Sequence, residues 1–207
     1  MTIDSLIFDL DGTLWDTSEQ CATAWNNVLA SQGIDYRKIT PADVREVTGR
    51  PHEECIRLTF SDLSVDQIES ISNATMIEDN RVIAQEGGVL YDGVIEALNE
   101  LKNRYQLFIV SNCQSGYIET FLRLNNLETV FEDIECWGNT GLPKGKNLRS
   151  IIERNQLQHP LMIGDAEGDE TAALECSIPF AFVSYGFGTS ISPELTFSSF
   201  MEIVTKL

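Results

Sequence analysis

The stretch Leu6-Ile7-Phe8-Asp9-Leu10-Asp11-Gly12-Thr13 decides the fold, because it places two carboxylates directly after a short apolar run. Continuous rather than alternating apolarity is typical of a parallel strand covered on both faces. The crevice outside the carboxyl ends of such strands is where open α/β sheets bind ligands. Side chains two residues apart on an extended backbone point to the same side, so we expect Asp9 and Asp11 to converge. Converging carboxylates repel unless a cation or a proton lies between them.

Three further apolar runs resemble the first and predict strands at 107–110, 161–163 and 180–183. Helical patterns lie between them, marked by Val94 to Leu101, Ile118 to Leu124, Leu148 to Ile152, and Ala172 to Cys176. Strands that alternate with helices from about residue 90 onward predict an α/β fold with a doubly wound parallel sheet.

Residues 16–87 contain no comparable strand run and read as helices. One helix runs through Ala24 to Leu29, a second opens at Pro41 with Thr40 as its N-cap, and two more cover 51–60 and 64–83. We therefore expect a catalytic core of residues 1–15 and 88–207, with residues 16–87 inserted after the first strand.

Polar residues follow the later strands at the same edge of the predicted sheet. Ser111-Asn112 follows the second strand, and a hydroxyl, an amide and free N–H groups there suit phosphate oxygens. Lys144 near a helix start can offset carboxylate and phosphoryl charge, with Lys146 as the alternative lysine. Gly164-Asp165 and Asp169 follow the third strand, and carboxylates gathered around Asp9 suit Mg²⁺.

With these four motifs in this order, the chain resembles the haloacid dehalogenase superfamily, in the branch of phosphoglycolate phosphatase and β-phosphoglucomutase. Asp9 to Thr13 matches the first motif, Ser111 the second, Lys144 the third, and Gly164-Asp165 with Asp169 the fourth. Many relatives have Pro after the third-motif lysine, where this chain has Gly145. The helical insert matches the family's α-helical cap in place and size.

The resemblance implies a Mg²⁺-dependent phosphatase acting on a small-molecule phosphate monoester. Asp9 would be the nucleophile that forms an aspartyl-phosphate, and Asp11 the general acid and base. Asp9, the backbone carbonyl of Asp11 and Asp165 would hold Mg²⁺, and Asp169 would orient these ligands. Ser111 and Lys144 would hold the phosphoryl oxygens. Substrate contacts are expected from Asn112, Thr13 and Arg50, the last in a cap loop that faces the site.

Other functions remain open on the sequence. A sugar phosphomutase would use the same residues and return the phosphoryl group to a sugar. A non-enzymatic phospho-acceptor also has an acidic cluster and a lysine on a doubly wound sheet, but it lacks the helical insert and an acid such as Asp11. A dehalogenase needs no metal, and a phosphonatase-like Schiff base needs a cap lysine, for which only Lys38 is present in the insert.

The amino-acid composition limits the classes of partner that the protein can bind. The formal charge of -18 argues against nucleic acid and anionic membranes, because phosphate backbones need a basic footprint. No apolar run is long enough for a membrane span, and the N-terminus lacks a basic segment typical of a secretory signal. Five scattered cysteines without CxxC spacing indicate free thiols in a reducing compartment. We expect a cytoplasmic protein, monomeric or weakly dimeric, whose partner is a small phosphorylated metabolite.

Overall fold

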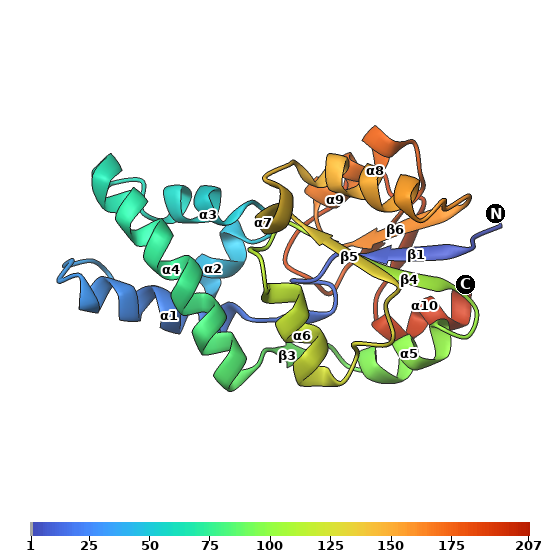
Figure 1. The fold of residues 1–207 in the computed structure, drawn as a ribbon, viewed down its shortest axis with the longest axis horizontal. Coiled ribbons are helices and arrows are strands. Elements are labelled where there is room, and N and C mark those ends of the chain that lie inside the picture. The colour runs from blue at the N-terminus through green and yellow to red at the C-terminus, as the bar shows by residue number, and fades with distance from the viewer. Residues whose placement is uncertain (1) are drawn as a thin grey trace.

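The computed structural model describes residues 2–207 as a twisted parallel sheet covered by helices on both faces, with a group of helices at one end (Figure 1). The strand order is β5-β4-β1-β6-β7-β8, and all neighbours are parallel. The bounds are β1 Ser5–Phe8, β4 Gln106–Ser111, β5 Asp133–Cys136, β6 Pro160–Gly164, β7 Phe180–Val183 and β8 Leu195–Phe197. The predicted doubly wound α/β sheet is confirmed, and β1 lies at its centre.

The apolar runs form the centre of this sheet because both of their faces are covered. Leu6, Ile7 and Phe8 of β1 are fully buried. Ile7 packs in the apolar cluster under the helices of one face, whereas Leu6 and Phe8 join the larger cluster on the other face. The ring of Phe8 stacks on that of Phe200, with centroids 5.7 Å apart. Continuous apolarity in β1 is therefore explained by burial on both sides.

Helices cover the two faces as the crossover connections require. In Figure 1 α8 and α9 lie on one side of the sheet, and α5, α6 and α10 on the other. Their bounds are α5 Val94–Leu101, α6 Tyr117–Asn125, α8 Lys144–Arg154, α9 Glu167–Cys176 and α10 Phe200–Lys206, with the short α7 at Trp137–Thr140. All four helices predicted after residue 90 are present.

Two strands of the sheet were not predicted from the sequence. In β5, the acidic side chains of Asp133 and Glu135 alternate with Ile134 and Cys136, so no apolar run marks the strand. β5 is an edge strand, and Arg154 of α8 pairs with both acids at 2.6 Å. β8 forms the other edge and contains only three residues. Edge strands in natural sheets are often short or carry charged side chains, which weakens their apolar pattern.

The segment 16–87 is helical, as expected, and packs mainly on itself. Its helices are α1 Ser18–Ser31, α2 Pro41–Val47, α3 His52–Thr59 and α4 Val65–Glu86. Thr40 caps α2 in a capping box with Asp43, as its position predicted. The chain enters and leaves this group through β2 Trp15–Asp16 and β3 Val89–Leu90, which pair antiparallel.

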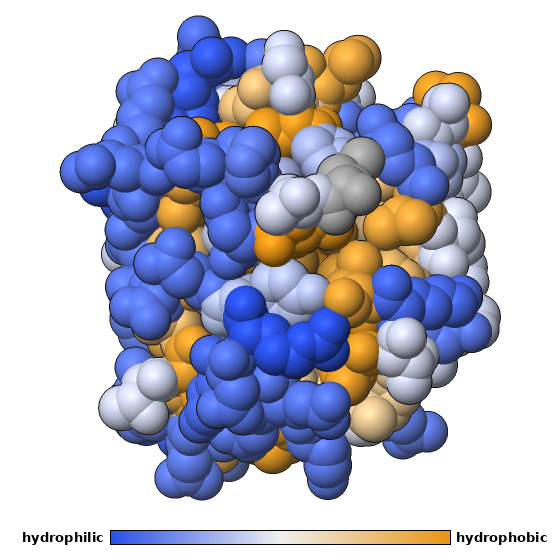
Figure 2. All heavy atoms as spheres, turned by 90° about the vertical axis from the view of Figure 1, so that its right-hand side faces the viewer, coloured by the Kyte–Doolittle hydropathy of each residue, from blue (hydrophilic) through white to orange (hydrophobic). Residues whose placement is uncertain are grey.

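Figure 1 shows that the carboxyl ends of the sheet strands face the helices of this segment, while both termini lie at the opposite end. The terminal end is shown in Figure 2, where hydrophilic side chains surround scattered apolar ones. Across residues 2–207, the helices are too short or too polar to cross a bilayer.

Candidate active site

Three carboxylates and a lysine meet at the carboxyl ends of β1 and β6. Oxygens of Asp9, Asp165 and Asp169 lie within 4.8 Å of one another, and all three residues are buried. The Nζ of Lys144 lies 2.6 Å from Asp9 Oδ1 and 2.5 Å from Asp169 Oδ1. Lys144 is buried, whereas Lys146 is exposed. The structure thus brings together Asp9, Lys144, Asp165 and Asp169, and it places Lys144 rather than Lys146 at the site.

Burial sets the electrostatics of this cluster. It raises the pKa of Asp9 well above its usual range, against the opposing effect of the Lys144 ammonium. It also raises the pKa of Asp165 to about 7, with Asp169 adding to the rise. Burial lowers the pKa of Lys144, but the carboxylates of Asp169 and Asp9 outweigh it, so the pKa is raised and the lysine stays charged.

Backbone N–H groups fix the two acids that follow β6. Asp165 Oδ2 accepts hydrogen bonds from the backbone N–H groups of Phe187 at 2.7 Å and Gly188 at 3.2 Å. Asp169 Oδ2 accepts from the N–H groups of Asp165 and Ala166, each at 3.1 Å. Asp169 therefore presents its other oxygen to Lys144, and the loop after β7 positions Asp165.

Two glycines allow the close packing around Asp165. Gly12 has a φ of +85°, and a Cβ at this position would overlap the Asp165 carboxylate. Gly186 lies against both Asp165 and the Gly12 carbonyl, so a Cβ there would also overlap them. Only glycine fits both positions.

Asp11 stands apart from the cluster and faces the inserted helices. Its Oδ1 accepts hydrogen bonds from Tyr117 Oη at 2.7 Å and Thr17 Oγ1 at 3.0 Å, and these two hydroxyls lie 2.6 Å apart. Thr17 is the N-cap residue of α1, but its hydroxyl makes no capping hydrogen bond and donates to Asp11 instead. Burial raises the pKa of Asp11 to about 6, and the hydrogen bonds from Tyr117 and Thr17 oppose the rise.

The remaining predicted residues lie around these acids. Ser111 is buried at the end of β4, and its Oγ accepts a hydrogen bond from the Cys113 N–H. Asn112 donates from Nδ2 to the Gly49 carbonyl at 2.8 Å and so connects the sheet to the insert. Thr13 is buried with Oγ1 3.5 Å from Asp165 Oδ1. Arg50 is half-exposed and donates to the carbonyls of Glu46 and Val47, each at 3.2 Å.

A cavity of about 70 Å³ joins these residues to the interior of the insert. It is lined by Asp9, Asp11, Ser111 and Asn112 on the sheet side, and by Arg50, His52 and Asp79 among the residues of the insert. A wider hollow of about 480 Å³ adjoins it, sharing Asp11 and Arg50 and reaching Asp165. The acids therefore line two adjoining hollows, a small one that reaches into the insert and a larger one beside it.

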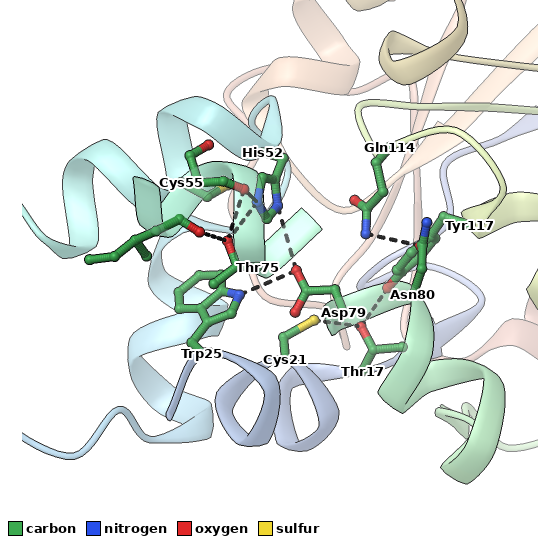
Figure 3. Close-up of polar contacts among 12 residues, drawn as sticks. Thr17, Cys21, Trp25, His52, Cys55, Thr75, Asp79, Asn80, Gln114 and Tyr117 are labelled. Atoms are coloured by element: carbon green, nitrogen blue, oxygen red, sulfur yellow. Dashed lines mark hydrogen bonds and ion pairs between the residues drawn. The ribbon is translucent and has the colours of Figure 1, made fainter. Parts of the chain in front are cut away.

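Sequence reasoning missed the polar groups inside the insert. Asp79 of α4 is 2% exposed and accepts from Trp25 Nε1 at 3.2 Å, while His52 Nδ1 lies 3.5 Å from it (Figure 3). One signal was available: Asp79 falls in the buried stripe of α4 that includes Thr75, Val82 and Ile83. An acid on the apolar face of a helix is rare unless paired. Tyr117 left no comparable signal in the sequence.

The donor set fits a divalent cation. Three hard carboxylates and one ammonium leave two negative charges in a buried space, which a divalent cation neutralises. Carboxylate oxygens are the ligands that Mg²⁺ takes, together with water and phosphate. The site can therefore bring an anionic group to Asp9 once such a cation is bound.

Comparisons with known proteins identify the family of the chain. A model of the family described as haloacid dehalogenase-like hydrolase matches residues 6–183. A phosphoglycolate phosphatase of Agrobacterium fabrum is 23% identical, with 97% of this chain and 91% of that protein covered. A 5'-nucleotidase of Pseudomonas aeruginosa is 27% identical, with 89% and 84% covered.

Solved structures share the fold. A haloacid dehalogenase-like hydrolase family protein from Streptococcus pneumoniae superposes with a TM-score of 0.85 at 22% identity, covering 99% of this chain and 98% of that one. A protein from Haemophilus somnus, described as a predicted phosphoglycolate phosphatase, gives a TM-score of 0.87 at 20% identity, covering 100% and 99%.

Proposed function

The chain belongs to the haloacid dehalogenase-like hydrolase family, and from this we propose that it is a Mg²⁺-dependent phosphatase that hydrolyses small-molecule phosphate monoesters through an aspartyl-phosphate. The single observation that carries the proposal is the buried group of Asp9, Asp165 and Asp169 around the Lys144 ammonium. Relatives named phosphoglycolate phosphatase and 5'-nucleotidase support phosphate monoesters as the substrate class.

Asp9 is the nucleophile in this proposal. A carboxylate oxygen of Asp9 attacks phosphorus, the bond from phosphorus to the leaving oxygen breaks, and water later cleaves the aspartyl-phosphate. Two displacements replace one difficult step. Lys144, hydrogen-bonded to Asp9 Oδ1, orients this carboxylate and, with Ser111, faces the phosphoryl oxygens.

Asp11 is the general acid and base. It gives a proton to the leaving oxygen and later takes one from the attacking water. The hydrogen bonds from Thr17 and Tyr117 to Oδ1 leave Oδ2 as the oxygen for this exchange. Both residues therefore position Asp11 without touching the reacting atoms.

Asp9, Asp165 and the backbone carbonyl of Asp11 would hold the cation, and Asp169 orients Lys144 and the backbone of Asp165. When bound, Mg²⁺ offsets the repulsion between the nucleophile and the phosphate dianion and polarises the phosphoryl group.

Residues 16–87 act as a cap over a core of residues 1–15 and 88–207. Support comes from the cavity, which is lined from both parts, and from the hydrogen bond between Asn112 and the Gly49 carbonyl. A closed cap excludes bulk water from the reaction. Asn112, Thr13 and Arg50 are the substrate-side residues in this arrangement. The protein acts as a monomer or weak dimer in the cytoplasm, where its five free cysteines stay reduced.

The test is phosphate release from p-nitrophenyl phosphate, with Mg²⁺ and with EDTA. We expect activity that EDTA abolishes and that Asp9→Asn lowers by at least roughly 10³-fold. Asp92→Asn, an exposed aspartate, is the matched control and keeps full activity. Metal-independent release, or full activity of Asp9→Asn, contradicts the proposal. An isomerised sugar phosphate without free phosphate would identify a mutase instead.

A further inference from the structure

Residues 185–188, which follow β7, form a loop that connects two parts of the acid cluster. In the sheet order β1-β6-β7, the loop begins two strands away from β1, and Asp165 lies between them at the end of β6. Neighbouring strands lie about 4.8 Å apart, so the loop starts about 10 Å from the turn that follows β1. A contact between the loop and this turn therefore crosses the end of β6.

Tyr185 makes this contact with its side chain. Its Oη donates a hydrogen bond to the backbone carbonyl of Thr13 at 2.9 Å, and Thr13 is fully buried in the turn after β1. The Tyr185 ring packs against Tyr91, with centroids 4.8 Å apart, and both rings adjoin the larger apolar cluster. Because packing already orders the ring, the hydrogen bond costs little further side-chain entropy.

The rest of the loop holds Asp165. Gly186 lies against the Asp165 side chain and the Gly12 carbonyl, and the N–H groups of Phe187 and Gly188 donate to Asp165 Oδ2. Two donors occupy Oδ2, so Oδ1 has the greater remaining capacity to bind a cation. Four consecutive residues thus contact both the turn after β1 and the acid after β6.

This connection opposes the repulsion between two acids. Oxygens of Asp9 and Asp165 lie within 4.8 Å of each other, and both residues are buried. Carboxylates at this separation repel, and a divalent cation between them removes the repulsion. A contact that keeps the turn after β1 close to Asp165 therefore favours the cation-bound protein over the cation-free protein. Ligands that are held in place before binding raise the affinity.

We propose that Tyr185 is a positioning residue for the divalent cation: through the Thr13 carbonyl it keeps the turn that follows Asp9 at binding distance from Asp165. The inference rests on the proposed function, which assigns the cation to these two acids. The Tyr185 hydroxyl is engaged by a backbone carbonyl and is not one of the cation's ligands. Its removal should therefore weaken Mg²⁺ binding and leave the chemical step unchanged once Mg²⁺ is saturating.

Tyr185→Phe removes the hydroxyl and keeps the packed ring. Isothermal titration of Mg²⁺ into the variant should give a Kd about 3- to 10-fold higher than that of wild type, the range expected for the loss of one hydrogen bond. Half-maximal release of phosphate from p-nitrophenyl phosphate should need a correspondingly higher Mg²⁺ concentration. At saturating Mg²⁺, kcat should stay within about 2-fold of the wild-type value.

Tyr105→Phe is the matched control, because the Tyr105 Oη also donates to a backbone carbonyl, that of Leu207, at 2.8 Å. This carbonyl belongs to the C-terminus, at the opposite end of the sheet from the acids (Figure 1). The control should bind Mg²⁺ with the wild-type Kd.

Urea unfolding separates positioning from a purely structural role. A structural role predicts that Tyr185→Phe lowers the unfolding free energy equally in Mg²⁺ and in EDTA. Positioning predicts a larger loss in Mg²⁺, because a ligand that binds the variant more weakly stabilises it less.

The outcomes keep this inference distinct from the proposed function. An unchanged Mg²⁺ Kd in Tyr185→Phe would overturn the inference and leave the phosphatase proposal intact. A weakened Kd in a protein that hydrolyses no phosphate ester would support the inference and contradict the phosphatase proposal. A wild-type protein that binds no Mg²⁺ would overturn both.

Discussion

Two buried acid clusters, one at the end of the sheet and one inside the insert, are stabilised in different ways. Around Asp9 and Asp169 the compensating group is a cation, the ammonium of Lys144. Around Asp79 no lysine or arginine of the described residues pairs with the carboxyl group; Trp25 Nε1 donates to it, His52 Nδ1 lies 3.5 Å away, and burial raises its pKa well above the usual range. The first cluster has more carboxylates than cations and suits a metal, whereas the second contains a single carboxylate whose Oδ1 is buried without a hydrogen-bond partner.

Removing the cation from the first cluster has the largest expected effect. Lys144→Met leaves Asp9 and Asp169 buried without their counter-charge, so we expect unfolding free energy in EDTA to fall by about 3–5 kcal/mol. Phosphate release should fall by roughly 10³-fold. Urea unfolding and the p-nitrophenyl phosphate assay measure the two effects. Lys146 is exposed on the same helical turn, so Lys146→Met should change neither the unfolding free energy nor phosphate release. Equal losses of stability and activity in the two variants would contradict the assignment of Lys144 as the lysine of the site.

The proton in the second cluster should appear as a pH dependence of stability. Asp79 has a raised folded pKa, so its stabilising contribution is present below its ordinary pKa near 3.8 and is lost as pH rises toward the folded value. As the pH rises above 3.8, wild type should lose unfolding free energy relative to Asp79→Leu, because the folded protein holds a proton on Asp79 that the unfolded chain has released.

Urea unfolding of both proteins at several pH values measures this difference. The other titratable groups beside Asp79 are His52, Cys21, Asp11 and Glu78, and all are present in both proteins. Glu69→Gln, which removes one exposed charge from the same helix, should follow the wild-type slope. If the unfolding free energies of wild type and Asp79→Leu changed equally with pH, Asp79 would hold no extra proton in the folded protein. The proposed difference between the two acid clusters would then be wrong.

The smallest expected effect lies between the clusters, at Tyr117. Tyr117→Phe removes the hydroxyl that donates to Asp11 Oδ1 and leaves Thr17 as the remaining donor. We expect kcat to fall by about 10-fold with KM unchanged, because one hydrogen bond of about 0.5–1.5 kcal/mol positions Asp11. Tyr105→Phe, whose hydroxyl donates to Leu207 instead, should leave kcat unchanged. A rise in KM alone would place Tyr117 in substrate binding.

The centre of the fold could be predicted because its strands are covered on both faces. Leu6 to Phe8 and Leu107 to Val110 are buried without interruption, so apolarity alone marks them. The edge strand β5 could not be found this way, because its acids pair with Arg154 of a helix that follows later in the chain. The strand is stabilised by a tertiary contact, which the local sequence pattern does not indicate.

The same physics separates the two clusters. Asp9 and Asp165 immediately follow strand runs, and parallel strands bring their carboxyl ends to one edge, so their meeting could be predicted. Asp79, Trp25 and His52 lie on three different helices, and only the rotation and packing of those helices bring them together. Helix faces are readable from sequence, but which faces meet is decided by packing.

The pairing of β2 with β3 affects how segments of different length can be inserted at this point of the chain. Trp15 pairs with Leu90 and Asp16 with Val89, so the backbone returns to the point where it left. Seen from the sheet, residues 17–88 occupy the place of a hairpin turn, and a two-residue Asn-Gly link would satisfy the same geometry. Loop-closure entropy grows only with the logarithm of length, so segments of very different size are interchangeable at this junction. A segment exchanged at this junction would have to keep a hydroxyl at position 17, because Thr17 donates to Asp11 from the first turn of the insert.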